Sequence, residues 1–300
     1  MLLNNFIDES EYRLSALYPE KEAHSIIMIL CEERMGVKNY THIVDPMYEI
    51  PQEWVSVLHS DVDRLAAGEP LQYVLGYSDF CDRRFTVNGN VLIPRPETEI
   101  MTREAVKIGG RMQRMRVAYG KEARPVEVLD LCTGSGCIAW TMALNIPYAH
   151  VVGVDVSAEA LEVAAAQSFA SELSSGPYSA PEFIWGDILE PGCEFGQYDI
   201  LIANPPYIRE SEKASMRKNV LDYEPALALF VSDADPLVFY RAIADIALRD
   251  LCPGGRGFVE INEELGERTK DLFVAAGLRE VAIIKDLYAK DRFVSFVKSK

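Results

Sequence analysis

The segment of residues 204–207, which reads Asn-Pro-Pro-Tyr, has the residue types needed to hold a planar amino group. It follows the apolar run of residues 198–203, which predicts a buried strand. Two consecutive prolines fix two φ angles and remove two backbone donors, so the segment offers acceptors, namely the Asn204 amide oxygen and the Pro205 carbonyl. Tyr207 could supply a flat face against the bound group. The alternative is a plain proline turn at the end of a strand.

A glycine-containing loop upstream of this segment predicts a cofactor site of the nucleotide type. Residues 126–130 predict a strand and residues 138–144 a helix, with Gly134 and Gly136 in the turn between them. Glycine permits close approach of a ligand, and the first N–H groups of a helix have no partners within it. A second strand ends about twenty residues later in Asp155, where an acid commonly binds a ribose diol. The pattern fits a nicotinamide enzyme and an S-adenosylmethionine enzyme equally.

Three features favour S-adenosylmethionine. Asp130, at the end of the first strand, suits a methionine ammonium better than a pyrophosphate. Asp187, followed by Ile188, comes after the short strand of residues 183–185 and is placed to meet an adenine amino group. The acceptor segment at Asn204 would lie in line with the sulfonium, and a nicotinamide enzyme has no evident use for it. The alternative for each aspartate is that it caps the helix or turn that follows.

The composition limits the class of protein. The chain has 300 residues, of which 49% are hydrophobic, as is typical of a packed globular protein. A formal net charge of −16 and a pI of about 4.8 argue against broad contact with a nucleic-acid backbone. The six cysteines show no Cys-x-x-Cys spacing and there are four histidines, so we expect neither a metal site nor a disulfide framework. We recognise no signal peptide and no membrane-spanning run, and expect the cytoplasm as the compartment.

The N-terminal part of the chain predicts a small helical domain. Apolar residues recur at helical spacing in residues 23–30 and again in residues 54–65. A Gly-Glu-Pro sequence at residues 68–70 then breaks the pattern. We therefore expect a helical domain over residues 1–80.

A β-hairpin is predicted to link this domain to the rest of the chain. Residues 85–87 and 91–93 are apolar and flank the turn sequence Asn-Gly-Asn at residues 88–90. The expected organisation is a hairpin linker over residues 81–94, followed by a catalytic domain over residues 95–300.

The segment of residues 94–99 stiffens the start of a further helix, which Glu97 or Thr98 could cap. We expect this segment to form a wall of the active site, with Arg95 and Glu97 on the substrate side. The locally basic residues 109–116 are expected to form a solvated loop before the first strand of the sheet. Contact with an RNA-bearing partner is the alternative for this loop.

The C-terminal third of the chain predicts the remainder of an α/β sheet. The expected helices cover residues 236–251 and 264–276, and the expected strands cover residues 257–261, 281–284 and 293–297. The last two strands are joined by too short a link for a parallel crossover, so they must pair antiparallel. The predicted fold is that of S-adenosylmethionine-dependent methyltransferases, a Rossmann-like, mostly parallel sheet with one antiparallel strand at the C-terminal end. Its site lies across the carboxyl edge.

Five motifs together carry a family resemblance. They are Gly-Glu-Pro-Leu-Gln-Tyr at 68–73, Ile-Pro-Arg-Pro-Glu-Thr-Glu at 93–99, Leu-Asp-Leu-Cys-Thr-Gly-Ser-Gly-Cys-Ile-Ala at 129–139, Asn-Pro-Pro-Tyr-Ile at 204–208 and Asp-Leu-Tyr-Ala-Lys-Asp-Arg at 286–292. With them the chain resembles the peptide-chain release factor glutamine methyltransferases, the PrmC/HemK family, over nearly all of the sequence beyond residue 67. Adenine amino-methyltransferases share the Asn-Pro-Pro-Tyr motif, but the Arg-Pro-Glu-Thr-Glu element is much more specific to this family.

The resemblance implies transfer of a methyl group from S-adenosyl-L-methionine, which leaves S-adenosyl-L-homocysteine, to a glutamine side-chain nitrogen. The glutamine is that of the Gly-Gly-Gln motif of release factors. The residues that would line the cofactor are Cys132, Thr133, Gly134, Ser135, Gly136 and Asp155. By the same resemblance Asn204, Pro205, Pro206 and Tyr207 would hold the glutamine, and Asn204 would touch both ligands. No metal is implied.

This sequence departs from the family pattern at two positions. Cys132 and Ala289 stand where the pattern usually has glycine. Two other classes of function also stay open, an adenine-specific nucleic-acid amino-methyltransferase and a non-catalytic nucleotide-binding module. Since the chemistry is complete without residues 1–80, we expect that domain to recognise the release factor.

Overall fold

The computed structural model describes residues 1–118 and 124–300, which divide into two compact units. The first unit holds residues 1–77 and 216–223, and the second holds residues 78–215 and 224–300. The first break lies close to the predicted boundary at residue 80. That residues 216–223 group with the N-terminal helices was not predicted, because a short polar segment does not reveal its distant neighbours.

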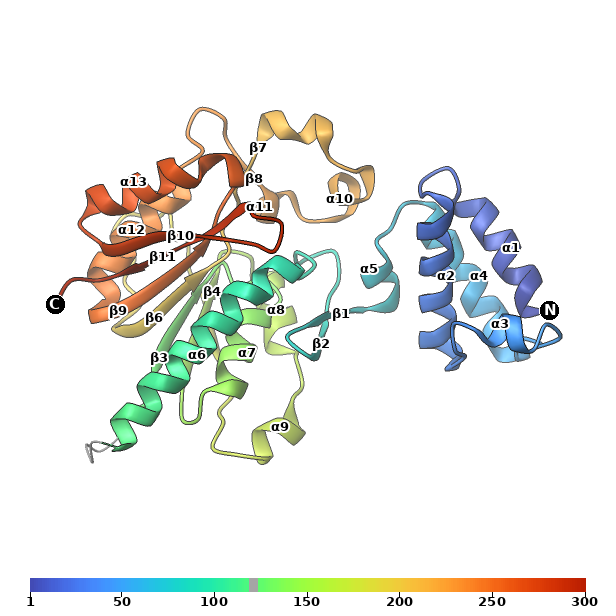
Figure 1. Ribbon diagram of the computed structural model, residues 1–300, viewed down its shortest axis with the longest axis horizontal. Coiled ribbons are helices and arrows are strands. Elements are labelled where there is room, and N and C mark those ends of the chain that lie inside the picture. The colour runs from blue at the N-terminus through green and yellow to red at the C-terminus, as the bar shows by residue number, and fades with distance from the viewer. Residues whose placement is uncertain (119–123) are drawn as a thin grey trace. The chain divides into compact units, whose positions relative to one another are not determined.

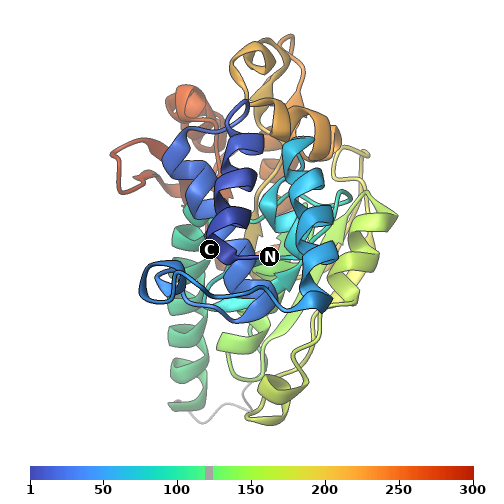
Figure 2. The same cartoon turned by 90° about the vertical axis from the view of Figure 1, so that its right-hand side faces the viewer.

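The first unit is helical. Its helices are α1 (Leu3–Leu14), α2 (Glu20–Met35), α3 (Thr41–Val44), α4 (Gln52–Ala66), α5 (Leu71–Leu75) and α10 (Lys218–Tyr223). Figures 1 and 2 both show α1, α2 and α4 packed side by side. The apolar stripes predicted in residues 23–30 and 54–65 supply this core, since Ile27 and Leu30 of α2 and Leu58, Val62 and Leu65 of α4 are fully buried.

The β-hairpin lies earlier than predicted. Its strands are β1 (Tyr77–Phe80) and β2 (Arg83–Thr86), and the two residues between them, Cys81 and Asp82, have φ angles of 48° and 64°. Positive φ at both positions gives a turn of type I′, whose twist matches that of paired strands. Residues 88–91 form only a local turn, because the Asn88 side chain accepts a hydrogen bond from Asn90 N at 2.9 Å. The prediction of a hairpin centred on residues 88–90 is therefore wrong.

Within the described residues, seven strands form the central sheet of the second unit. They are β3 (Glu127–Leu131), β4 (His150–Asp155), β5 (Glu182–Trp185), β6 (Tyr198–Ala203), β9 (Leu251–Glu260), β10 (Arg279–Lys285) and β11 (Asp291–Val297). Their order is β10-β11-β9-β6-β3-β4-β5, and β11 is antiparallel to both neighbours whereas the other pairs are parallel. The predicted sheet is confirmed, although the reversed strand lies second from the edge.

Helices cover both faces of this sheet (Figure 1). On one face lie α6 (Pro96–Ala118) and α7 (Cys137–Asn145), and on the other lie α12 (Val238–Asp250) and α13 (Gly266–Ala276). Successive residues of β3 alternate between the two apolar cores, since Val128 packs with α6 and α7 and Leu129 packs with α12 and α13. The sheet is thus buried on both sides, and its carboxyl edge is where polar groups gather.

Helix α6 is longer than the sequence predicts. It includes the basic residues 109–116, so the loop predicted there is wrong. Two adjacent glycines resemble a helix break, but here Gly109 allows α6 to approach the sheet closely. A Cβ at that position would lie 2.4 Å from Ile146 Cδ1 and 3.1 Å from Ile200 Cδ1. At the end of the helix, Arg116 pairs with Asp199 at 2.6 Å.

Replacing Gly109 with alanine is expected to lower the free energy of unfolding by up to about 2 kcal/mol. Overpacking a buried site costs about 1–3 kcal/mol, and the better helix propensity of alanine returns about 1 kcal/mol. Gly110→Ala is the matched control, because a Cβ there meets no atom closer than Arg114 Nη1 at 3.4 Å and the propensity gain should prevail. Urea unfolding measures both variants. Equal stabilisation by the two would contradict the close packing at Gly109.

Candidate active site

The register of the sheet places one residue from each of four strands in a row at its carboxyl edge. Leu131 of β3 pairs with Val154 of β4 and with Ala203 of β6, and Ala203 pairs with Val259 of β9. The residues that follow these positions are, from β4 to β9, Asp155, Cys132, Asn204 and Glu260. Four positions far apart in the sequence therefore meet because of strand pairing alone.

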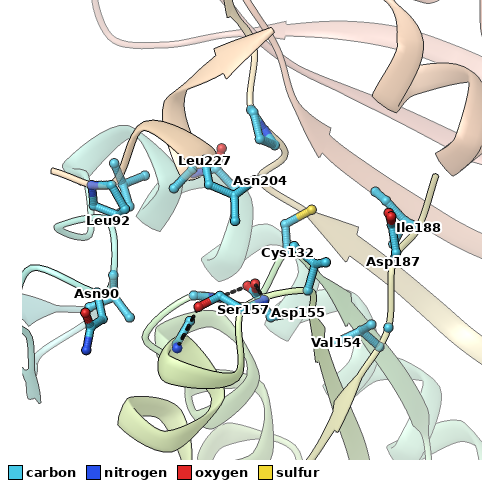
Figure 3. A pocket seen from close by; sticks show the side chains of 18 of the residues that line it. Asn90, Leu92, Cys132, Val154, Asp155, Ser157, Asp187, Ile188, Asn204 and Leu227 are labelled. Carbon is cyan, nitrogen blue, oxygen red and sulfur yellow. Dashed lines mark hydrogen bonds between the residues drawn. The ribbon is translucent and has the colours of Figure 1, made fainter. Parts of the chain in front are cut away.

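A cavity within the second unit opens beside this row. Its walls enclose about 750 Å³ of space that no protein atom fills, part of which is open solvent. Asp155, Cys132 and Asn204 line it, as do Asp187 and Ile188 after β5. Figure 3 shows Leu92 and Leu227 on the same side of the cavity as Asn204, with Asp187 and Ile188 on the opposite side. Among the described residues that line it, the charged ones are Asp155 and Asp187, and none is basic.

The loop between β3 and α7 takes its shape from three residues with positive φ. Gly134 and Gly136 have φ angles of 53° and 76°. Both values are positive, as expected for the glycine turn that the sequence predicts. Cys132 has a φ of 60°, a region that costs a residue with a side chain about 1–2 kcal/mol. The preference of the family pattern for glycine at this position is explained by that torsion. Cys132 and Gly134 line the cavity, whereas the side chains of Thr133 and Ser135 are buried away from it.

Asp130 is fully buried behind the loop and does not line the cavity. Its Oδ2 accepts hydrogen bonds from Thr133 Oγ1 at 2.6 Å and from Ala139 N, in the first turn of α7, at 3.1 Å. Its Oδ1 has no partner among the described residues. Burial raises the pKa of Asp130 to about 7, against the opposing effect of these two hydrogen bonds. Asp130 therefore caps the helix, and it also keeps one acceptor free.

Asp155 and Asp187 line the cavity and at the same time hold the local backbone. Asp155 accepts from Gly134 N at 2.8 Å and from Ser157 N at 3.0 Å, and Asp187 accepts from Leu189 N at 2.8 Å. Burial raises the pKa of Asp155, and the backbone hydrogen bonds counteract that rise in part. The capping interpretation and the ligand interpretation of these aspartates are thus compatible, because each oxygen can accept a second hydrogen bond.

The segment after β6 brings two of its four residues to the cavity. Asn204 and Pro206 line it, whereas Pro205 is buried and the Tyr207 side chain turns toward β9. Asn204 Nδ2 donates to Thr98 Oγ1 at 3.3 Å, which leaves its oxygen free to accept. Tyr207 donates to Glu260 Oε1 at 3.0 Å, and burial together with that carboxylate raises the Tyr207 pKa well above its usual value. Tyr207 is thus held by its hydroxyl rather than free to move over a ligand.

Arg95 and Glu97 do not line the cavity. Arg95 pairs with Glu224 at 2.6 Å, and the same carboxylate accepts from Ile93 N at 3.2 Å. Glu224 thereby ties two walls of the cavity together, since Leu92 and Pro225 on either side of the tie both line it. The assignment of Arg95 and Glu97 to the substrate stays a prediction.

Several residues of the site were missed from the sequence. Asn90, Val91 and Leu92 line the cavity but were read as part of a hairpin, and the segment of residues 225–228 gave no signal. Glu260 was read only as part of a strand. An acidic residue within the apolar run of residues 257–261 is an available signal, because a charge at the end of a buried strand needs a reason.

The second departure from the family pattern also falls on a strained residue. Ala289, in the turn between β10 and β11, has a φ of 61°. Asp286 holds this turn by accepting from Tyr288 N and Lys290 N, and it pairs with Arg292 at 3.0 Å. The sequence of an aspartate, a residue with positive φ and an arginine therefore forms a turn that its own hydrogen bonds stabilise, and alanine at position 289 is tolerated at the cost of backbone strain.

The polar groups of the cavity fit S-adenosylmethionine. That molecule presents N–H and O–H donors on its ammonium, ribose and adenine, and the cavity offers carboxylates and the Asn204 oxygen as acceptors. A pyrophosphate would face Asp155 and Asp187 without a basic residue among those lining the cavity, which is unfavourable.

Within residues 1–118 and 124–300, no group of three histidine, cysteine or acidic residues could hold a metal ion. The same residues contain no helix long and apolar enough to cross a membrane.

The sheet order, the glycine loop and the acceptor-lined cavity define a methyltransferase of the S-adenosylmethionine-dependent class. Comparison with known families agrees with this. Residues 6–76 match the PrmC N-terminal domain, and residues 115–223 match the methyltransferase small domain.

Individual relatives give the family. The release factor glutamine methyltransferase of Flavobacterium psychrophilum is 35% identical over 298 residues, 98% of each chain. That of Bacteroides thetaiotaomicron is 36% identical, over 94% of this chain and 95% of the relative. The crystal structure of a release factor-specific protein-(glutamine-N5) methyltransferase from Alicyclobacillus acidocaldarius is 26% identical with a TM-score of 0.40, over 72% of this chain and 100% of that one. The chain belongs to the family of release factor glutamine methyltransferases, which confirms the family inferred from its motifs.

Asp130 gives the ligand-free protein a predicted pH dependence. Its pKa is about 7 when folded and 3.8 as an unperturbed group, so its stabilising contribution is complete below about pH 4 and is lost as the pH rises through 7. Asp130→Asn keeps an oxygen for both hydrogen bonds but cannot ionise. The variant should gain about 2–3 kcal/mol of unfolding free energy over the wild type between about pH 5 and about pH 8. Urea unfolding at both pH values measures this, and a constant difference would show that Asp130 titrates normally.

Proposed function

We propose that this protein transfers a methyl group from S-adenosyl-L-methionine to the side-chain nitrogen of the glutamine in the Gly-Gly-Gln motif of peptide-chain release factors. The observation that carries the proposal is that the Asn204 acceptor and the carboxylates of Asp155 and Asp187 line one cavity. Membership of the family supports the same substrate. An amino acceptor of the adenine type would use the same segment, so the test includes nucleic acid.

The donor side of the cavity would bind S-adenosylmethionine through its hydrogen-bond donors. Asp155 would accept from the ribose hydroxyls, and Asp187 with Ile188 would meet the adenine. Cys132 and Gly134 would lie against the methionine part, and Asp130 would contribute negative charge behind the loop, opposite the ammonium. When bound, S-adenosylmethionine supplies a methyl group on a positively charged sulfur.

The acceptor side would orient the glutamine by its two N–H groups. An amide nitrogen is a poor nucleophile because its lone pair is delocalised, so the lone pair must be turned toward the methyl group. The Asn204 side-chain oxygen and the Pro205 carbonyl would accept the two hydrogens and so fix that direction. As positive charge grows on nitrogen, both oxygens bind those hydrogens more strongly, which favours the transition state over the ground state. The proton can pass to water after transfer, so no general base is needed beforehand.

The first unit is proposed to recognise the release factor. All the groups assigned to the chemistry lie in the second unit, while the first unit has its own core and is matched by a separate family domain. The cytoplasm, where release factors act, stays the expected compartment.

Asn204→Ala should lower kcat by at least about 100-fold, because it removes one of two acceptors for the reacting amide, and should leave cofactor affinity within about tenfold. The measurement is transfer of labelled methyl groups from S-adenosylmethionine to a purified release factor, with mass mapping of the modified peptide. Asn145→Ala is the matched control, since Asn145 is exposed at the far end of α7. Full activity of the Asn204 variant would contradict the mechanism, and label in DNA or RNA instead of protein would contradict the proposed substrate.

A chain that begins at residue 77 should still bind S-adenosylmethionine but should lose methylation of the intact release factor. It should keep methylation of a short peptide that contains Gly-Gly-Gln, because the groups that hold the glutamine remain. Cofactor binding shows that the shortened chain is folded. If it methylates the intact factor as fast as the full chain does, the first unit has no part in recognition.

A further inference from the structure

Glu260 is a buried carboxylate that contacts both helix α6, through Thr98, and the segment after β6, through Tyr207. It ends β9 and is 1% exposed. Thr98 Oγ1 donates to its Oε2 at 2.6 Å, and Tyr207 donates to its Oε1 at 3.0 Å. Both oxygens of the carboxylate therefore accept from a neutral hydroxyl, and the two hydroxyls come from separate parts of the chain.

The hydrogen bond from Thr98 to Glu260 determines which atom of Asn204 is free. A hydroxyl has a single proton, and an ionised carboxylate can only accept, so Thr98 must give its proton to Glu260. The Thr98 oxygen is then left as an acceptor, and it receives Asn204 Nδ2 at 3.3 Å. With its nitrogen held in this way, Asn204 presents its oxygen to the cavity.

We infer that Glu260 is a positioning residue that acts through Thr98 to keep the Asn204 amide oxygen directed at the methyl acceptor. This role rests on the proposed function, because it matters only if the acceptor is an amino group that must be bound by an oxygen. Reversal of the Asn204 amide would present two N–H donors to the N–H donors of the substrate and would repel it.

The cost of burying Glu260 supports a role beyond packing. Burial raises its pKa, although the hydrogen bonds from Thr98 and Tyr207 and the nearby Arg292 counteract the rise. Arg292 itself pairs with Asp286 at 3.0 Å and approaches Glu263 at 3.6 Å. Burying a carboxylate costs desolvation free energy even when hydroxyl groups donate to it. Apolar residues of similar volume would pack these elements together without that cost.

The test compares Glu260→Gln, Thr98→Val and Thr98→Ser in the full-length protein. Thr98 and Tyr207 donate to different oxygens of Glu260, and glutamine at 260 replaces one of those oxygens with an NH2 donor group, so it cannot accept from both hydroxyls in this arrangement. Valine at 98 removes the hydroxyl at nearly constant volume. Each of these two changes should lower kcat for release factor methylation by about 10–100-fold, the effect expected for loss of a hydrogen bond to a charged group. The dissociation constant of S-adenosylmethionine should change by less than about twofold.

Two further variants separate positioning from general destabilisation. Thr98→Ser keeps the hydroxyl and should restore most of the kcat that Thr98→Val loses. The double variant Glu260→Gln/Thr98→Val should be no slower than Thr98→Val alone, because both changes break the same chain of hydrogen bonds. Losses that multiply in the double variant, or a serine variant as slow as the valine variant, would overturn the inference.

Binding of S-adenosylmethionine by a variant shows that the variant is folded. If Glu260→Gln does not fold, the comparison of kcat between Thr98→Val and Thr98→Ser tests the inference by itself. Wild-type kcat in both Glu260→Gln and Thr98→Val would also overturn the inference. A wild-type protein that binds S-adenosylmethionine but methylates no release factor would instead overturn the proposed function, and this role with it.

Discussion

The parallel register of β4, β3, β6 and β9 is the constraint on which the site depends. Pairing of Leu131 with Val154 and Ala203, and of Ala203 with Val259, brings the next residue of each strand to one edge. A slip of one residue in any pair would send that residue to the other face of the sheet. The cores on both faces prevent such a slip, because each strand has apolar residues committed to α6 and α7 or to α12 and α13.

The charged side chains that line the cavity at this edge are all carboxylates. The carboxylates of Asp155 and Asp187 and the oxygen of Asn204 meet in the cavity, while Asp130 and Glu260 lie buried behind it. Burial raises the pKa of Asp130, Asp155 and Glu260 alike, so the fold bears a cost for each of them. Such an arrangement suits ligands that are cationic or rich in N–H and O–H groups, and both proposed ligands are of that kind.

The sequence allowed the central sheet, the glycine loop and the position of the acceptor segment to be predicted, because strand ends and proline turns are local signals. It did not allow the hairpin to be placed. The Asn-Gly sequence at residues 88–89 is the stronger turn signal, but the turn of the hairpin is formed by Cys81 and Asp82, which adopt positive φ although neither is glycine. The extension of α6 through Gly109 and Gly110 was also hidden, because the need for glycine there comes from Ile146 and Ile200, which are distant in the sequence. The partnership of Thr98, Asn204 and Glu260 could not be foreseen either, as it joins three separate elements. Cys132 and Ala289 stand where the family pattern usually has glycine, and the structure explains that preference because both residues have positive φ.

The most direct test of the account is a crystal structure with S-adenosyl-L-homocysteine and a peptide that contains Gly-Gly-Gln. The account predicts that the glutamine carboxamide nitrogen lies within hydrogen-bond distance of both the Asn204 side-chain oxygen and the Pro205 carbonyl, and faces the sulfur. A carboxamide bound elsewhere, or an Asn204 side chain that presents its nitrogen to the cavity, would contradict it.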